Sequence, residues 1–392
     1  MDLNRSITSV NVDILKDSIP IHKKNKFTIF CMNVRSARKN FNELVCLLNV
    51  LKGDFDIVAL TETWLTEESN IGYNLMGNAS YHIYRNQNGG GVSIYFKDHI
   101  QINKINNLCA IYNTFKSIFL SITLNNTTFN LGCIYRLIGP CRLFSDELNR
   151  LILSNTLLKN NTVLVGDFNV NLLLDPLPNS TSELVNLLNS HNYKQLITRP
   201  TRETDSTKTL IDQFWSNLNG VCETAVISYR ISDHYPIAAS LNLDKTPDSN
   251  PSFFYRLFND SRVDRFHEEL LTLRQETEAN INLNVDTLTD IFIQKLHNII
   301  ASVFPVVRKT HKLKIAASPW ITKDLLKCIR KKHKLFKLYK ENKIMFASYS
   351  RFRNLLNFSI KLAKSLFYRK KFYLCNGDPK KYWKVLNNYI GK

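Results

Sequence analysis

The sequence predicts an α/β sandwich of two facing mixed β-sheets with helices outside, followed by a basic, all-α helical segment. Two observations support this prediction. Between Phe27 and Leu243, short β-rich runs alternate with segments whose apolar residues recur at helical spacing. Beyond residue 252 the helical pattern dominates and the charge changes sharply, because residues 301–392 contain 24 basic and 3 acidic side chains.

Each element of the first region is predicted from its own pattern. Apolar runs bounded by polar residues predict strands, and Phe41, Leu44 and Leu48 recur at the spacing of a helix. The expected strands are 27–32, 56–63, 89–96, 116–124, 127–136, 162–168, 209–215 and 234–243, and the expected helices are 40–51, 144–158 and the first part of 182–196.

A polar stretch with two prolines, residues 244–252, is typical of a linker. We therefore expect an N-terminal arm at 1–26, an α/β domain at 27–243 and a helical, basic segment at 253–392. Within that segment Ser318 is the expected N-cap of a helix that has Pro319 in its first turn and ends near Glu341. A second helix is predicted over about 345–374, and a short third helix begins at Pro379.

The charge is concentrated in one part of the chain. The net charge is +19, yet residues 1–250 contain 23 basic and 22 acidic side chains. On the helix after Pro319 five cations recur at 4, 3, 4, 3 spacing and form one stripe. Such a stripe is commonly only a solvated face, but the imbalance of 24 to 3 favours contact with a nucleic acid. The stripe consists of Lys323, Lys327, Arg330, Lys334 and Lys337.

The other compositional signals are those of a soluble, intracellular protein. Eight cysteines are scattered without CxxC spacing, which favours reduced core thiols over a disulfide or zinc framework. No apolar run approaches the ~20 residues of a membrane span, so we expect no membrane partner.

Polar clusters follow six of the apolar runs, where catalytic groups on an α/β scaffold tend to lie. Taken singly, each cluster has an ordinary explanation as a turn or a solvated strand end. Together they supply the groups that phosphodiester hydrolysis needs: a hard cation, an activated water and stabilisation of the leaving oxygen. The clusters are Asn33, Glu62, Tyr135 with Arg136, Asp167 with Asn169, Asp212, and Asp233 with His234.

Each cluster has an expected role. Glu62 is the first choice as a ligand of Mg²⁺, or of Mn²⁺, with Asn33 and Asp233 as further candidates. Asp167, beside Asn169, suits deprotonating the attacking water. His234 is expected to bind a phosphate oxygen or share a proton, with Asp212 fixing its tautomer. Tyr135 offers its hydroxyl to the phosphate, and Arg136 is expected to contact the nucleic acid.

These residues, in the order N…TET…YR…GDFN…LID…SDH, resemble the endonuclease/exonuclease/phosphatase superfamily. Within it, ALTETWL (59–65), TRPTR (198–202) and TLIDQFWSN (209–217) are most similar to the endonucleases of jockey-type and CR1-type LINE retrotransposons. Residues 319–340 and 377–392 resemble the helical segment that precedes the reverse transcriptase in those polyproteins.

The resemblance implies a four-layer sandwich that nicks target DNA and leaves a 3′-hydroxyl to prime reverse transcription. It also implies a nuclear location, element RNA bound by the basic helices, and a reverse transcriptase in cis. RKKHK (330–334) or KTHK (309–312) would serve as a basic import signal. No aromatic-Ala-Asp-Asp run of a polymerase occurs, so we expect the chain to be a fragment.

Two departures and two alternatives accompany this interpretation. Arg136 is followed by Leu137-Ile138 where relatives often have a proline pair, and Arg35 stands where abasic-site enzymes often have an acid, so abasic-site specificity is not expected. One alternative is a phosphomonoesterase on the same scaffold. The other is a decayed retroelement remnant that only binds nucleic acid through its basic helices.

Overall fold

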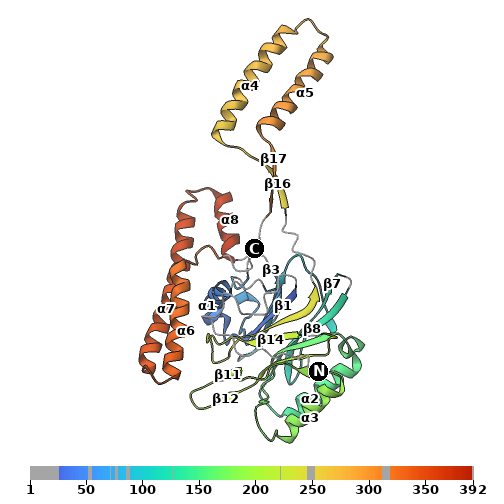
Figure 1. Ribbon diagram of the computed structural model, residues 1–392, viewed down its shortest axis with the longest axis vertical. Helices are drawn as coiled ribbons and strands as arrows, with labels where there is room; N and C mark the ends of the chain where they lie inside the picture. Colours follow the sequence, from blue (N-terminus) through green and yellow to red (C-terminus); the bar gives the residue numbers. More distant parts are fainter. Residues whose placement is uncertain are drawn as a thin grey trace. The chain divides into compact units, whose positions relative to one another are not determined.

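The computed structural model describes residues 26–51, 55–70, 72–75, 78–84, 89–125, 127–220, 222–244, 252–310 and 318–390 (Figure 1). They belong to two compact units. The first combines the α/β region, up to residue 246, with the helices after residue 313, and the second covers 247–313. The expected arm up to residue 25 and the expected linker residues 245–251 lie outside the described residues.

One sheet of the first unit aligns two of the expected site residues. Its strands β1 and β2 are parallel, and Asn33 at the end of β1 pairs with Thr61 at the end of β2. Glu62 follows directly, so the parallel register brings Asn33 and Glu62 to the same edge. The sheet order is β14 (Cys222–Val226), β15 (Ile237–Asp244), β1 (Lys26–Asn33), β2 (Ile57–Thr61), β4 (Val92–Lys97) and β3 (Asn78–Ile83).

The second sheet aligns three more of the expected site residues. Tyr135 on β8 pairs with Asp167 on the parallel strand β9, and Asp167 pairs with Asp212 on the antiparallel strand β13. The sheet order is β10 (Lys194–Gln195), β13 (Asp212–Ser216), β9 (Thr162–Asp167), β8 (Thr127–Arg136), β7 (Phe115–Leu124) and β5 (Gln101–Lys104), with β6 (Ala110–Ile111) also paired to β7. A separate hairpin joins β11 (Arg202–Glu203) and β12 (Lys208–Thr209).

The two sheets face one another across an apolar core that includes Phe27, Ile118 and Val165. Helix α1 (Ala37–Val50) covers the first sheet, and α2 (Cys141–Ser154) and α3 (Asn179–Ser190) cover the second. The predicted sandwich is therefore confirmed, with helices on both outer faces. Short 3₁₀ turns occupy Glu68–Asn70, Asn106–Leu108 and Thr156–Lys159.

The C-terminal helices α6 (Lys323–Lys340), α7 (Phe346–Tyr373) and α8 (Pro379–Ile390) belong to the first unit. Trp320, Ile329 and Ile360 join the same buried cluster as the apolar residues of α1, and Figure 1 shows α6 and α7 beside α1. As a result 10 of the 14 residues of α1 are buried, compared with 5 of 14 in α2. The prediction that Ser318 caps this helix is wrong. Helix α6 begins after Thr322, whose hydroxyl accepts a hydrogen bond from the Leu325 N–H.

A buried ion pair reinforces this packing. Lys332 on α6 donates to the Glu43 carboxylate on α1 and to the Arg230 carbonyl oxygen at 2.8 Å. The Tyr229 hydroxyl donates to the same carboxylate at 2.8 Å. Lys332 and Glu43 are 2 % and 4 % exposed, so helices distant in sequence share a charge pair away from water.

The second unit is a helical hairpin on a two-stranded ribbon. Helices α4 (Asp260–Ala279) and α5 (Val285–Val303) follow N-caps at Asn259 and Asn284, and strands β16 (Ser252–Arg256) and β17 (Val306–Thr310) pair antiparallel. The helical pattern did not predict these two strands. Among the residues described, no helix has the length and hydropathy needed to cross a membrane.

Candidate active site

The expected catalytic residues converge at one edge of the two sheets. Asn33 is the link between them: its side-chain amide donates to Glu62 Oε1 at 2.9 Å and to Asp167 Oδ2 at 2.7 Å. Its side-chain oxygen accepts the Arg35 N–H at 3.1 Å. Asn33 therefore positions two carboxylates, while its side-chain oxygen, the atom expected to bind a metal ion, accepts a backbone hydrogen bond.

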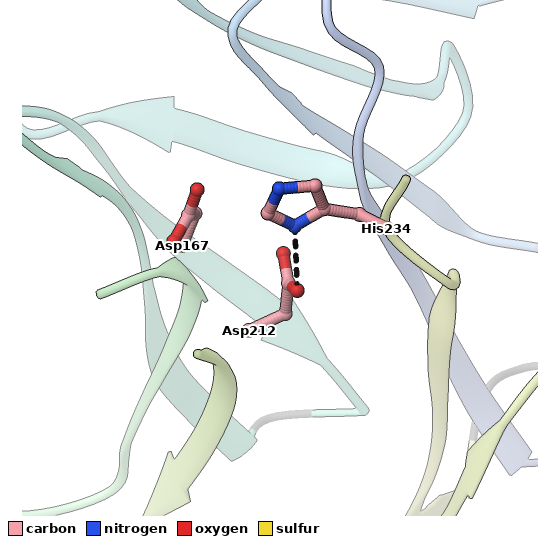
Figure 2. A group of neighbouring side chains, drawn as sticks. All are labelled: Asp167, Asp212 and His234. Atoms are coloured by element: carbon pink, nitrogen blue, oxygen red, sulfur yellow. Dashed lines mark hydrogen bonds and ion pairs between the residues drawn. The ribbon is translucent and has the colours of Figure 1, made fainter. Parts of the chain in front are cut away.

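Asp167, Asp212 and His234 form a tight buried group. Their possible ligand atoms lie within 4.8 Å of one another. Figure 2 shows the Asp167 carboxylate facing the imidazole and the bond between His234 Nδ1 and Asp212 Oδ2, which measures 2.8 Å. This is the tautomer-fixing contact predicted for Asp212. The sequence did not identify Thr201, whose buried hydroxyl accepts the Asp212 N–H at 2.9 Å, although it lies in the TRPTR motif.

Burial and the neighbouring charges shift the pKa values of the residues in this group. Burial raises the pKa of Asp167 to about 7, and the neighbouring Asp212 adds to the shift. Burial alone would lower the pKa of His234, but the charge of Asp212 and their hydrogen bond raise it to about 9. At neutral pH the imidazole is therefore cationic, and the raised pKa of Asp167 brings this carboxylate closer to the range of a general base.

The backbone near the carboxylates is constrained. Glu62 has φ of 50°, which is rare for a side chain of this size, and its carbonyl oxygen accepts the Ser36 N–H at 2.8 Å. Asn169 has φ of 49°; its N–H donates to Asp167 Oδ1 at 2.9 Å. A Cβ at Gly166 would lie 1.9 Å from the Ile134 carbonyl oxygen, so the glycine of GDFN is required by strand packing.

Tyr135 lies in the same row as Asp167 and is 8 % exposed. Burial, and then the charges of Glu62 and Asp167, raise the pKa of its phenol, so the hydroxyl keeps its proton at neutral pH. A protonated hydroxyl is the form that the predicted donation to a phosphate oxygen requires. The buried Lys116 is its cross-strand partner on β7 and was not identified from the sequence.

Asp233, a predicted metal-ligand candidate, binds two arginines in this structure. Its two oxygens bind Arg35 Nη1 and Arg202 Nε, both at 2.8 Å. Burial opposes its ionisation, but the hydrogen bond from Arg202 and the nearby positive charges lower its pKa to about 2. Asp233 is thus an ionised anchor for two arginines.

Arg136 also differs from its expected role in contacting nucleic acid. It is 4 % exposed, and its guanidinium donates to the Asn169 carbonyl oxygen at 3.0 Å and to the Gly139 carbonyl oxygen. Asn169 Nδ2 returns a bond to the Arg136 carbonyl oxygen at 2.7 Å. These contacts fix the loop after β9 and make Arg136 a positioning residue.

The basic stripe of α6 is exposed along its whole length, with all five cations on the face away from α1. Lys327 pairs with Asp324 at 3.0 Å, and Lys337 with Glu341 at 3.9 Å. In the expected import run RKKHK, by contrast, Lys332 and His333 are buried. Part of the other run, KTHK, lies outside the described residues.

Two facing sheets that present carboxylates, a cationic imidazole and a phenol at one edge define a hydrolase scaffold for phosphate esters. The sequence matches the Endonuclease/Exonuclease/phosphatase family over residues 32–234, just over half of the chain. The chain belongs to this family, whose members hydrolyse phosphodiester or phosphate bonds and generally depend on a divalent metal ion.

Several solved structures are similar to part of the chain. The endonuclease domain of TRAS1, a telomere-specific non-LTR retrotransposon, is 14 % identical, with a TM-score of 0.46 over 56 % of this chain and 100 % of that chain. An AP endonuclease from Archaeoglobus fulgidus is 12 % identical, with a TM-score of 0.41 over 55 % of this chain and 100 % of that chain. No curated protein sequence matches the chain.

The donor set fits a divalent metal ion. Two carboxylates buried beside one imidazolium leave a surplus of negative charge, and burial, followed by the charge of Asp212, raises the pKa of Asp167. Oxygen donors are those that hard cations prefer. Glu62, which the sequence predicts as a metal ligand, is joined to Asp167 through Asn33 and would hold the ion, with Asp167 and Asp212 as the neighbouring carboxylates.

Proposed function

We propose that the protein is a Mg²⁺-dependent DNA endonuclease of a LINE-type retrotransposon. The observation that carries the proposal is the Asp167–Asp212–His234 group joined through Asn33 to Glu62. The jockey- and CR1-like motifs support the retrotransposon assignment. The exposed stripe on α6 supports a polyanionic substrate over a small phosphomonoester.

The chain's own residues divide the chemistry among them. Asp167, held by Asn33 and the Asn169 N–H, accepts a proton from the attacking water. The imidazolium of His234, fixed by Asp212, stabilises the charge that develops on the phosphate, and Tyr135 donates to another phosphate oxygen. The water oxygen bonds to phosphorus while the bond from phosphorus to O3′ breaks, and O3′ takes a proton from solvent, which leaves a 5′-phosphate and a 3′-hydroxyl. Mg²⁺, when bound, neutralises phosphate charge and stabilises the leaving oxygen.

Plasmid nicking tests the proposal. The wild-type chain is expected to nick supercoiled plasmid with Mg²⁺ and not with a chelator, and His234→Ala is expected to lose the activity while its circular dichroism is unchanged. Asp146→Asn, an exposed aspartate on α2, is the matched control. A polymerase should extend the nicks directly. Wild-type nicking by His234→Ala would contradict the site, and release of inorganic phosphate without nicking would favour a phosphomonoesterase.

We extend the proposal to the partners and location of the intact polyprotein. The stripe on α6 would bind element RNA or target DNA, a reverse transcriptase would follow in cis, and nicking would take place in the nucleus. These follow from the LINE-type assignment. Localisation of a full-length tagged polyprotein, and cross-linking of its RNA to α6, test them.

A further inference from the structure

A cavity of about 320 Å³ lies beside the active site, and two distant parts of the chain line it. Ser232, on its wall, donates to the Asn33 carbonyl oxygen at 2.8 Å and accepts the His234 N–H at 3.1 Å. The cavity and the catalytic residues therefore share one segment of backbone. Helix α7 supplies the far side with Tyr349 and Arg353.

The charge of this cavity is strongly positive. Four of its lining residues are cations: Arg35, Lys39, Arg230 and Arg353. Asp233 is the one acid among the described lining residues, and both of its oxygens are occupied by arginines. An anion entering the cavity meets arginine and lysine donors without a competing free carboxylate.

The side supplied by α7 is held in place by its packing. Tyr349 is 3 % exposed, and its ring centroid lies 5.3 Å from that of Phe336 on α6. The Arg353 guanidinium lies over the Tyr349 ring at 5.9 Å, and its Nη2 donates to Ser350 Oγ at 3.2 Å. Because α6 and α7 are anchored to α1 through the apolar cluster and the Lys332–Glu43 pair, Arg353 has a fixed position relative to the active site.

We propose that this basic pocket binds a backbone phosphate next to the scissile one in the DNA strand, so that α7 is part of the endonuclease's substrate site. Arginine guanidinium groups match phosphate oxygens in a two-pronged geometry, and the Trp64 indole on the cavity wall offers a surface for the adjoining base. The identification of the anion as DNA rests on the proposed function, whereas the lining and charge of the pocket are independent of it.

DNA binding by the full chain tests the proposal. In an Asp167→Asn background, binding of a fluorescein-labelled duplex is measured in Mg²⁺ as a function of salt. Arg353→Ala is expected to weaken binding about tenfold or more and to reduce the slope of log K against log salt by about 0.9. Lys39→Ala, on the opposite wall, should behave alike. Arg351→Ala, an exposed arginine two residues away on the same helix, should match the background protein.

The outcomes separate this proposal from the proposed function. If Arg353→Ala binds like Arg351→Ala, with the same slope, the basic pocket is overturned whether or not the wild-type protein nicks plasmid. If Arg353→Ala and Lys39→Ala both lose affinity while the wild-type protein cleaves nothing, the pocket stands and the endonuclease assignment fails. Arg353→Lys, which keeps the charge, should retain the slope and lose part of the affinity, and a misfolded helix would not give that pattern.

Discussion

Two buried groups of charges in the first unit differ in one respect, their balance. Between α1 and α6, one carboxylate meets one ammonium group, and Tyr229 completes the hydrogen bonding of Glu43. At the sheet edge, two carboxylates share one imidazolium. A balanced pair supports a structural role, whereas an unbalanced buried group with shifted pKa values is typical of a functional site.

The direction of the pKa shifts expresses the same difference. Burial lowers the pKa of Lys332, and Glu43 opposes that shift. Burial raises the pKa of Asp167 and the charge of Asp212 raises it further, whereas the charge of His234 lowers it only in part. The charged form of Asp167 is therefore disfavoured in the metal-free fold, so the surplus carboxylate costs stability there.

The largest expected effect is on catalysis. Asp167→Asn should lower the nicking rate by about 10² to 10⁴-fold because the general base is lost. In chelator the same variant should be at least as stable as the wild type, since a repelled buried charge has been removed. Nicking assays and urea unfolding measure the two quantities. A large loss of stability in Asp167→Asn would show that the carboxylate is structural and that the contrast between the two groups is mistaken.

The balanced pair should give the opposite result. Lys332→Met should reduce the free energy of unfolding by about 3–5 kcal/mol, because Glu43 is left buried and unpaired. Adding Glu43→Gln should recover most of that loss. Lys334→Met, on the exposed face of the same helix, should stay within about 0.5 kcal/mol. Urea unfolding monitored by circular dichroism makes the measurement. Equal losses of unfolding free energy for Lys332→Met and Lys334→Met would refute a structural role for the Lys332–Glu43 pair.

A smaller effect should appear with pH. The pKa of His234 is about 9 in the folded protein and ~6.5 when unfolded, so the folded state holds the proton more tightly. Its stabilisation is complete below about pH 6.5 and is lost as the pH rises through about 9, at roughly 1.4 kcal/mol per pH unit. Unfolding of metal-free protein across this range should show the slope, and His234→Gln should flatten it. If His234→Gln leaves the slope of stability against pH unchanged, the pH dependence comes from another group.

The smallest effect on the fold should come from the exposed stripe. Replacing Lys327 and Arg330 by glutamine should change stability by no more than about 1 kcal/mol, since their charges are in water. Nucleic-acid affinity should nevertheless fall, and the salt slope should drop by about 0.9 for each phosphate that the variant no longer neutralises. Lys159→Gln with Lys194→Gln, both exposed on the α/β region, removes equal charge as a control. Identical slopes for the two double variants would leave the stripe a solvated face.

The convergence of the site could be predicted because strand ends carry their residues with them. Once β1 lies parallel to β2, and β9 between β8 and β13, Asn33, Asp167 and Asp212 have little freedom to be elsewhere. The sequence also predicted that Asp212 would hold the imidazole. A polar residue directly after an apolar strand can be recognised from its sequence neighbours alone, so this part of the site could be predicted.

The partners of single charges could not be predicted in this way. Asp233 is held by Arg35 and Arg202 from other elements, and Arg136 turns inward onto the loop that carries Asn169. Motif spacing gives a residue's position on a strand, but it does not give the partner that a long charged side chain contacts. The Glu43–Lys332 pair spans 289 residues, and in the sequence Lys332 is one more lysine in a basic run.

The burial of α1 on two sides has a practical consequence for dissecting the protein. A cut near residue 246 follows the family match, which ends at residue 234, yet it removes α6 and α7 and uncovers the apolar side of α1 that they shield. A freshly exposed patch of that kind favours self-association, so the shortened enzyme should precipitate or require detergent. The smallest well-behaved fragment that contains the whole α/β region should therefore retain the helices that follow it.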